Sequence, residues 1–261
     1  MQMKQKIQKM PKKQKKEKIG IIGFGFVGQA IYASTKYKSE VLVYDAYKEI
    51  QDNTKLNDLK KECRAIFVCV GTPENKDGSC NTEDIYNVLD NLKNYNGIII
   101  IKSTIPYSKI PKASNICYNP EFLDANTAEK DFRDQTYIVL GGNRDTTEKV
   151  QDIYNDFFSL YKVKKFEHCS IKEASDFKYT RNIYGALKVL FWEFIQDTTG
   201  NSRKISEMMK NLPVNEMNLV GLDGYRGFGG ACFPKDTAAW NSEHNHKLTK
   251  FMLDYNKDLQ D

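Results

Sequence analysis

A single cysteine in a glycine-rich segment is the residue best suited to covalent chemistry. Cys232 stands in the sequence Gly-Phe-Gly-Gly-Ala-Cys-Phe-Pro-Lys-Asp at 227–236. The small residues before it leave its sulfur approachable, and Lys235 and Asp236 follow closely enough to share its site. Because a nearby cation favours the thiolate, this setting indicates a nucleophile. A glycine-rich turn around a buried, inert cysteine is the alternative that these residue types leave open.

A second glycine-rich turn, near the start of the chain, is suited to binding a dinucleotide. Residues 23–28 are Gly-Phe-Gly-Phe-Val-Gly, and they follow a short apolar segment, 18–22, that is typical of a strand. In this context Gly23 permits a tight turn, Gly25 lets the backbone approach a pyrophosphate, and Gly28 lets the following helix pack closely on the strand. Unpaired N–H groups at the start of that helix would face the phosphates.

Asp45 would determine whether the site binds NAD or NADP. It ends a second predicted strand, 40–44, and lies 22 residues after Gly23. A carboxylate in this place accepts hydrogen bonds from the adenosine ribose and repels a 2′-phosphate. The sequence therefore predicts NAD, and not NADP, as the cofactor. The alternative is a glycine turn and a strand-end aspartate that bind nothing.

Strand-like and helix-like segments alternate through the first part of the chain. The predicted strands are 18–22, 40–44, 65–70, 97–101, 115–118 and 137–140, and the predicted helices are 27–36, 53–61, 82–94 and 146–160. This alternation is typical of an α/β fold with a Rossmann-type parallel sheet and helices on both faces. Such a sheet places the first glycine turn between a strand and a helix.

The pattern changes near Ser170. From 171 to about 198 the chain has the pattern of one long central helix, with no proline and one glycine, Gly185. Shorter helices follow. We therefore predict a disordered basic tail at 1–17, an NAD-binding Rossmann domain at 18–169, and a small all-helical domain at 170–261 that carries the catalytic cysteine.

Composition and charge argue against several classes of protein. The net charge is +5, and the first 18 residues alone hold eight lysines against one acid. The basic character therefore belongs to the tail, and no nucleic-acid partner is expected. The apolar runs are too short to span a bilayer, and no secretory signal is visible. The six cysteines form no C-x-x-C pair and the three histidines complete no metal site, which is typical of reduced thiols in a cytoplasmic protein.

Five segments in order resemble motifs of the nucleotide-sugar dehydrogenase family, which comprises UDP-glucose and GDP-mannose dehydrogenases. The segment at 227–236 resembles the family's G-x-G-G-x-C-F-P-K-D signature. Residues 68–73 resemble V-x-V-G-T-P, residues 102–106, Lys-Ser-Thr-Ile-Pro, resemble K-S-T-V-P, and residues 119–123 resemble N-P-E-F-L. The fourth match in chain order is the set of long-helix positions Glu173, Lys178, Asn182, Ala186 and Lys188 with Val189. The resemblance runs from about Lys18 to Trp240.

This resemblance implies an oxidoreductase that converts a sugar CH2OH to a carboxylate in two steps with two NAD. UDP-glucose and its product UDP-glucuronate, a sugar acid of polysaccharide biosynthesis, are the expected pair. Cys232 would trap the aldehyde as a thiohemiacetal that is oxidised to a thioester. Asp236 and Lys178 would assist proton transfer, and Asn182, one helical turn after Lys178, would help to hold the oxyanion.

The same resemblance assigns the remaining site residues. Glu121 would be the base for attack of water on the thioester, and Thr104 would position water or substrate near the nicotinamide. The cofactor would contact Gly23, Gly25, Phe26, Val27, Gly28, Asp45, Val70, Gly71, Thr72, Pro73, Ser103, Thr104 and Lys235. The substrate would contact Glu121, Phe122, Leu123, Lys178, Asn182, Phe228, Gly229 and Gly230. No metal is expected.

Three departures from the family pattern keep a second hypothesis open. The family continues with a further α/β domain that holds the substrate's nucleotide, whereas this chain ends soon after Cys232. Ala125 stands where the family has a second glutamate. Leu222–Arg226 replaces the D-x-R-I-G segment at a different spacing, with Arg226 as the candidate arginine. The second hypothesis is a catalytically weak or silent NAD-binding subunit that needs a separate chain to bind the nucleotide sugar. Since the family pairs through the long central helix, a homodimer is also expected.

Overall fold

The computed structural model of the chain describes residues 18–48, 54–210 and 226–261. The predicted basic tail, and most of the segment 222–226, lie outside those residues. The strands are β1 (Lys18–Ile22), β2 (Val41–Tyr44), β3 (Cys63–Val68), β4 (Ile98–Ile101), β5 (Ile116–Tyr118), β6 (Tyr137–Gly141) and β7 (Lys165–Cys169). The helices are α1 (Phe26–Ser34), α2 (Leu56–Glu62), α3 (Glu83–Asn91), α4 (Ala128–Asp134), α5 (Arg144–Phe157), α6 (Ile171–Thr199), α7 (Ser202–Met209), α8 (Phe233–His244) and α9 (Lys247–Gln260), with two 3-10 helices, η1 (Lys38–Glu40) and η2 (Tyr107–Lys109).

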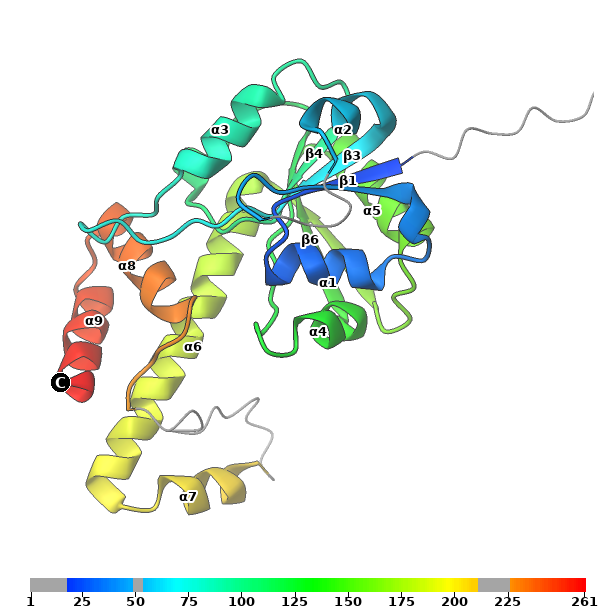
Figure 1. Cartoon of the computed structure of the whole chain (residues 1–261). Coiled ribbons are helices and arrows are strands. Elements are labelled where there is room, and N and C mark those ends of the chain that lie inside the picture. Colours follow the sequence, from blue (N-terminus) through cyan, green and yellow to red (C-terminus); the bar gives the residue numbers. More distant parts are fainter. Residues whose placement is uncertain (1–17, 49–53, 211–225) are drawn as a thin grey trace, which may run out of the picture.

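The seven strands form one sheet in the order β2-β1-β3-β4-β5-β6-β7. β1 to β5 are parallel to one another. The chain passes from β1 to β2 on one side and then to β3 on the other side of β1, so the carboxyl ends of β1 and β3 form a topological switch point, where α/β proteins bind ligands. Figure 1 shows the helices on both faces of this sheet, which confirms the predicted Rossmann-type α/β fold.

One pairing differs from the parallel sheet that we predicted. β6 is antiparallel to β5, with Tyr118 opposite Gly141, and β7 is parallel to β6. The segment between β5 and β6 holds only the short helix α4, which packs against α1. Because no helix there runs back along the sheet, the chain enters β6 beside the end of β5 and continues in the opposite direction.

The sequence analysis predicts neither β7 nor α4. β7 has the sequence Lys-Phe-Glu-His-Cys and lies at the edge of the sheet, where none of its residues is fully buried. α4 has seven residues, of which only Ala128 and Phe132 are buried. Both elements are too short and too polar to show the periodicity on which our predictions depend.

Alternate residues of the central strands face two separate cores. Ile21 and Phe67 lie in the core that α1, α4 and α5 cover. Ile22 and Val68 lie in the core on the opposite face, which α2, α3 and the first turn of α6 cover. Burial on both faces explains why these strands are apolar along their whole length.

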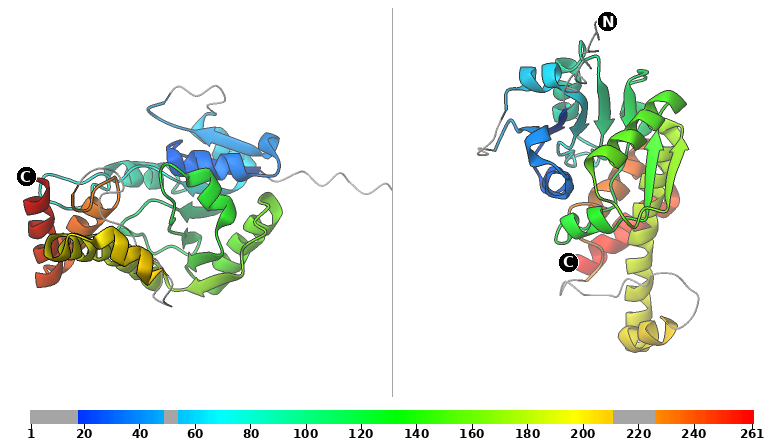
Figure 2. Two further views of the ribbon diagram at one scale, coloured as in Figure 1. Left: turned by 90° about the horizontal axis from the view of Figure 1, so that it is seen from below. Right: turned by 90° about the vertical axis from the view of Figure 1, so that its right-hand side faces the viewer.

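The 29-residue helix α6 joins the sheet to the remaining helices. A capping box of Ser170 and Glu173 fixes its first turn. Its first half packs against β5 and β6, and it also contacts α7, α8 and α9; Figure 2 shows its second half extending beyond the sheet. A β-carbon at Gly185 would lie 2.6 Å from the Phe233 ring, so this glycine lets α8 approach α6 closely.

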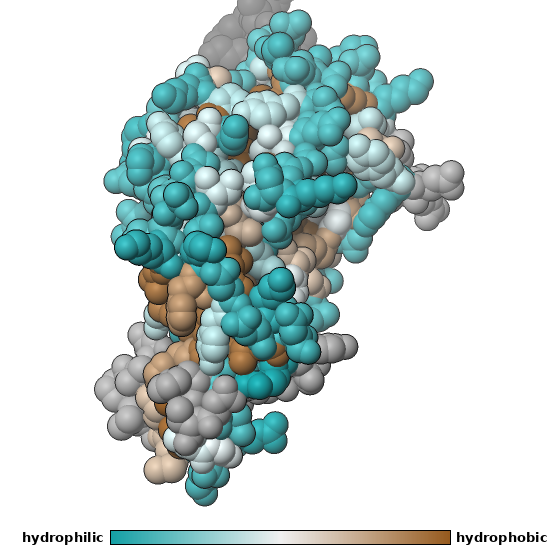
Figure 3. All heavy atoms as spheres, turned by 90° about the vertical axis from the view of Figure 1, so that its left-hand side faces the viewer, coloured by the Kyte–Doolittle hydropathy of each residue, from teal (hydrophilic) through white to brown (hydrophobic). Residues whose placement is uncertain are grey.

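Apolar side chains are exposed on the helices beyond the sheet. On α6, Phe177, Tyr184 and Phe191 are spaced seven residues apart and are 43–56% exposed. On α9, Leu248 and Phe251 are exposed as well. Figure 3 shows apolar side chains gathered in the lower half of the face that carries α9.

Candidate active site

One pocket brings the two glycine-rich motifs together. Its volume is about 390 Å³. It is lined by the predicted cofactor residues Gly25, Phe26, Val27, Val70, Gly71, Thr72, Pro73, Ser103, Thr104 and Lys235, and by Cys69, Lys102, Glu121, Ala231 and Cys232. We call residues 23–28 with Asp45 the glycine end of the site. We call Cys232 with Lys102, Glu121, Lys178, Asn182, Lys235 and Asp236 the cysteine end.

At the glycine end, a different structural feature favours glycine at each of the three fingerprint positions. Gly23 has φ +90°, and a β-carbon there would lie 2.7 Å from the Cys69 carbonyl oxygen. A β-carbon at Gly28 would lie 2.1 Å from the Gly23 carbonyl oxygen, so α1 needs a glycine in order to pack. A β-carbon at Gly25 would meet nothing within 4 Å, which leaves a surface that a ligand can approach. No side chain caps α1, so its first N–H groups are available to phosphates.

Asp45 holds the glycine turn in place. Its carboxylate accepts a hydrogen bond of 2.6 Å from the Phe24 N–H, and two more of 2.9 Å from the N–H groups of Tyr47 and Lys48. Burial would raise the pKa of Asp45, but these three N–H groups and the Lys48 ammonium outweigh burial and lower it. Asp45 is therefore an anion beside the turn, as recognition of ribose hydroxyls requires.

Cys232 lies at the entrance to α8 and in the wall of the pocket. The sequence predicts that a nearby cation lowers the pKa of this thiol, but in the protein without ligands the pKa is raised. Burial raises the pKa of the thiol; Lys178 and Lys235 act to lower it, but Glu121 and Asp236 act against them. The thiol is therefore protonated at neutral pH in this structure, and its use as a nucleophile requires a proton acceptor.

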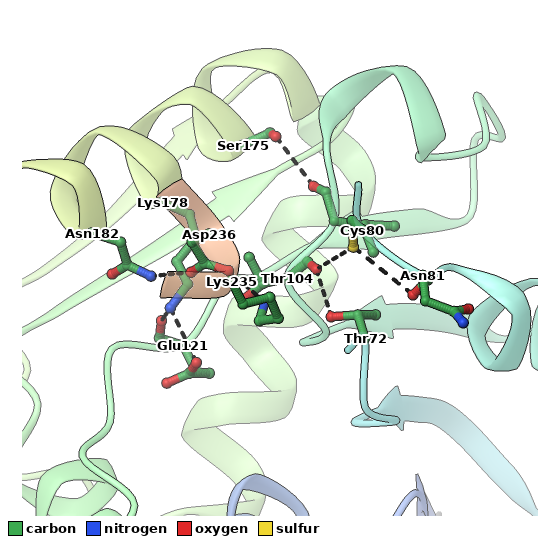
Figure 4. Close-up of polar contacts among 11 residues, drawn as sticks. Thr72, Cys80, Asn81, Thr104, Glu121, Ser175, Lys178, Asn182, Lys235 and Asp236 are labelled. Atoms are coloured by element: carbon green, nitrogen blue, oxygen red, sulfur yellow. Dashed lines mark hydrogen bonds and ion pairs between the residues drawn. The ribbon is translucent and has the colours of Figure 1, made fainter. Parts of the chain in front are cut away.

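Lys178 and Glu121 form a buried ion pair beside the pocket (Figure 4). Lys178 projects from α6 and donates hydrogen bonds to the Glu121 carbonyl oxygen at 2.8 Å and to its Oε1 at 3.1 Å. The two side chains are 2% and 6% exposed. Burial would raise the pKa of Glu121, but Lys178 and the Leu123 N–H outweigh burial and lower it. Glu121 is therefore an anion that lines the pocket.

Asp236 is the centre of a second buried group. Its carboxylate, on the first turn of α8, accepts hydrogen bonds from the Asn182 amide and from the Lys235 ammonium. Figure 4 shows Asn182 reaching it from α6. Asp236 and Asn182 are buried and are not among the residues that line the pocket, whereas Lys235 lines it.

The ends of β3 and β4 are tied together by side-chain hydrogen bonds. Ser103 donates to the Val70 carbonyl oxygen at 2.7 Å, and Thr72 donates to the Thr104 carbonyl oxygen at 2.8 Å. These bonds fix the wall of the pocket between the glycine end and the cysteine end.

Some predicted substrate residues do not line the pocket. Phe122 packs against Phe177 with ring centroids 5.5 Å apart. Phe228 is buried among α6 and α9, where its N–H donates to Asn256 Oδ1 at 2.5 Å. Leu123 packs against the core that α1, α4 and α5 cover. β-Carbons at Gly229 and Gly230 would meet nothing within 4 Å. The substrate roles of all five residues stay predictions.

The sequence analysis assigns no role to three residues that line the pocket, Cys69, Lys102 and Ala231. Lys102 is the chemically important one. It follows the apolar strand Ile98–Ile101 directly, and a lysine at the carboxyl end of a buried strand is a signal that should have placed it in the site. Cys69 and Ala231 offer no comparable signal.

The described residues also bear on the expectations for metal sites, membrane spans and disulfides. In the parts of the chain that the structure describes, no group of three or more potential metal ligands is found. Within the same residues, no helix combines the length and the apolar character needed to cross a membrane. All six cysteines, including Cys232, are free.

Part of the chain that forms the sheet matches a family model. Residues 40–158 match the UDP-glucose/GDP-mannose dehydrogenase family, NAD binding domain. Among curated proteins, UDP-glucose 6-dehydrogenase of Rickettsia felis is 30% identical over 222 residues, which are 77% of this chain and 49% of the relative. The chain thus spans about half the length of the curated relatives it matches.

Solved structures agree in fold. A UDP-glucose dehydrogenase from Pyrobaculum islandicum superposes with a TM-score of 0.73 at 20% identity, over 96% of this chain and 70% of that one. A GDP-mannose dehydrogenase from Pseudomonas aeruginosa gives a TM-score of 0.62 at 22% identity, over 93% and 69%. At these identities the likeness shows the fold alone.

Proposed function

We propose that the chain oxidises the CH2OH group of a nucleotide sugar to a carboxylate, since residues 40–158 match the NAD-binding domain of the UDP-glucose/GDP-mannose dehydrogenase family. The observation that carries this proposal is the pocket that residues of the dinucleotide fingerprint and Cys232 line together. UDP-glucose is the substrate we propose, with UDP-glucuronate as the product. The need for NAD and a nucleotide sugar favours the predicted cytoplasmic location.

The residues of the glycine end fit NAD. The open face of Gly25 and the uncapped start of α1 would hold the pyrophosphate, and Asp45 would accept hydrogen bonds from the adenosine ribose. The nicotinamide would then lie toward Cys232 and Lys102. When bound, NAD accepts a hydride from the substrate, once from the alcohol and once from the thiohemiacetal.

Cys232 serves between the two oxidations. Its sulfur adds to the aldehyde carbon, the carbonyl oxygen takes up a proton, and a thiohemiacetal forms. Loss of a hydride from its carbon and of the proton from its hydroxyl converts this adduct to a thioester. Water then attacks the thioester carbon and releases the carboxylate and the thiol. The overall balance is one alcohol, two NAD⁺ and one water in, and one carboxylate, two NADH and three protons out.

The buried ion pairs and Asn182 would transfer protons and stabilise the oxyanion in these reaction steps. We assign the second N–H of the Asn182 amide to the developing oxyanion, since the first donates to Asp236. Asp236 and Lys178 would assist proton transfer to and from the sulfur and oxygen. Glu121, an anion that lines the pocket, would accept a proton from the attacking water. Thr104 would position that water, and Lys235 would contact phosphates.

The exposed stripe of α6 supports pairing of two copies. Phe177, Tyr184 and Phe191 recur every seven residues, which is the spacing of helices that pack side by side. We propose a homodimer through α6. Sedimentation of Tyr184→Glu protein should then give a monomer, and an unchanged dimer would contradict this assignment.

A second candidate function rests on one residue. Ala125, on an exposed loop, stands where the family pattern has a second glutamate. Under this candidate the chain is an NAD-binding subunit that is silent until a separate chain binds the nucleotide sugar.

The test is NADH absorbance with NAD and a panel of UDP- and GDP-sugars, alongside calorimetry of NAD binding. NADH production with a nucleotide sugar supports the enzyme. NAD binding without NADH supports the silent subunit. If neither NAD binding nor NADH production is observed, both candidates are wrong.

A further inference from the structure

Lys102 is a buried ammonium that the reaction sequence above does not use. It follows β4, lines the pocket and is 3% exposed. Within the described parts of the chain its Nζ donates one hydrogen bond, 3.1 Å long, to Asn119 Oδ1. That oxygen also accepts a hydrogen bond of 2.5 Å from Tyr154 OH, and the Asn119 amide donates to the Val139 carbonyl oxygen at 2.8 Å. An ammonium has three N–H donors, so Lys102 can make further bonds.

The other two lysines of the cysteine end differ from Lys102 in their partners. Lys178 forms an ion pair with Glu121, and Lys235 forms one with Asp236. Among the described residues, no carboxylate lies within ion-pair distance of the Lys102 ammonium. Its charge is therefore the least compensated of the three.

The protonation of Lys102 depends on its burial and on the groups that surround its ammonium. Burial lowers the pKa of Lys102 to about 8, the Glu121 carboxylate acts to raise it, and the Lys178 ammonium acts to lower it further. Burial raises the pKa of the neighbouring Cys69 and Cys117 thiols, so both are neutral near pH 7. From α5 it receives only the neutral Tyr154 hydroxyl, through Asn119. Lys102 thus changes its charge near neutral pH, inside the pocket.

We propose that Lys102 distinguishes the two redox states of the cofactor, and that its positive charge favours bound NADH over bound NAD⁺. This rests on the proposed function, because it requires the nicotinamide to lie at the cysteine end. The oxidised ring is a cation and the reduced ring is neutral. A neighbouring ammonium therefore repels the first and not the second. Because the repulsion ends when the ring is reduced, the charge of Lys102 also favours hydride transfer from the substrate to the cofactor.

The expected size follows from Coulomb's law. At an effective dielectric of about 20, two unit charges about 10 Å apart change an affinity by roughly tenfold. The effect requires a protonated Lys102. It should be present at pH 7 and should fade as the pH rises through about 8.

The test compares dissociation constants for NAD⁺ and NADH, by calorimetry and by NADH fluorescence, without sugar. In the wild-type chain we expect the NAD⁺/NADH ratio of dissociation constants to fall between pH 7 and pH 9. In Lys102→Met the ratio should be about tenfold lower at pH 7 and independent of pH, whereas Lys102→Arg should keep the high ratio at every pH. Repeating the series in Cys232→Ala protein removes the contribution of the thiol.

The outcomes separate this inference from the proposed function. A ratio that is the same in wild type and Lys102→Met overturns the inference and leaves the proposed function standing. If Lys102→Met does not fold, the wild-type pH series decides, because a ratio that does not change with pH overturns the inference as well. Failure of the wild-type chain to bind either form overturns both.

Discussion

At the glycine end of the pocket the backbone makes most of the binding surface, whereas at the cysteine end buried side chains make it. The glycine end consists of open or tightly packed glycines, the start of α1 and one carboxylate. The cysteine end gathers three lysines, two carboxylates and an amide around the Cys232 thiol, from the segments after β4 and β5 and from α6 and α8.

The difference predicts how each end responds to change. A backbone surface tolerates a change of charge nearby but not an added carbon atom. A cluster of buried charges tolerates small changes of shape but not the loss of one partner, since the remaining charge is then uncompensated. The substitutions below are chosen to separate these two responses.

The largest effect should come from Cys232→Ala. Loss of the nucleophile should lower formation of the carboxylate product at least about 10³-fold while NAD binding is unchanged, because the second oxidation and the hydrolysis both depend on the sulfur. Initial rates and calorimetry measure the two quantities. Cys80→Ala is the matched control, since Cys80 lies nearby, against the Thr104 carbonyl oxygen at 3.7 Å, but outside the pocket lining. Equal losses in both variants would contradict the assignment.

Lys178→Met should destabilise the fold. It leaves Glu121 as a buried anion without its partner, which costs about 3–5 kcal/mol. Urea unfolding measures the loss. In the double variant Lys178→Met with Glu121→Gln, most of the stability should return while NADH production does not. Equal stability of the single and double variants would show that the pair is not coupled.

Gly25→Val tests the backbone surface. Its side chain would enter the space that we assign to the pyrophosphate, so the dissociation constant for NAD should rise by roughly 10- to 100-fold with the melting temperature unchanged. Gly28→Ala is the contrasting variant. Its β-carbon collides with the Gly23 carbonyl oxygen, so the melting temperature should fall as well. If Gly25→Val protein binds NAD with wild-type affinity, the pyrophosphate does not bind at this turn.

Asp45→Asn should narrow the preference for NAD over NADP by about tenfold, because the charge that repels a 2′-phosphate is lost. Calorimetry with both dinucleotides gives the ratio. If the ratio does not change, Asp45 does not contact the ribose.

The smallest change concerns the pH dependence of Cys232. Burial raises the pKa of its thiol, so the thiolate fraction in the free protein should increase with pH through neutrality and above. The rate of alkylation by iodoacetamide, followed by mass spectrometry of the Cys232 peptide, should rise up to about tenfold per pH unit without levelling off below pH 9. A plateau near neutral pH would mean that the lysines outweigh burial.

The fold was predictable where burial leaves a strong pattern. The parallel strands are apolar runs, and α6 is a long segment without proline that begins at a capping box. β7 and α4 were missed because an edge strand and a two-turn helix bury too few residues. The antiparallel direction of β6 depends on where α4 packs, which no local pattern encodes.

The sequence predicted many of the residues that line the pocket, but not Lys102 and not the pairs that the side chains form. Spacing placed Lys178 and Asn182 on one face of a helix, and the glycine pattern placed the first turn. The sequence did not indicate that Asn182 binds Asp236, that Lys178 binds Glu121, or that burial outweighs the cations around Cys232. These features depend on distances between elements that are far apart in the chain.

The ratio of NADH formed to nucleotide sugar consumed tests the central claim most directly. With NAD in excess and UDP-glucose limiting, we predict two NADH for each sugar, with mass spectrometry showing the uronate as the product. One NADH for each sugar with an aldehyde as the product would contradict the account. It would mean that the pocket binds NAD and oxidises an alcohol, but that Cys232 and its buried ion pairs take no part in a second oxidation.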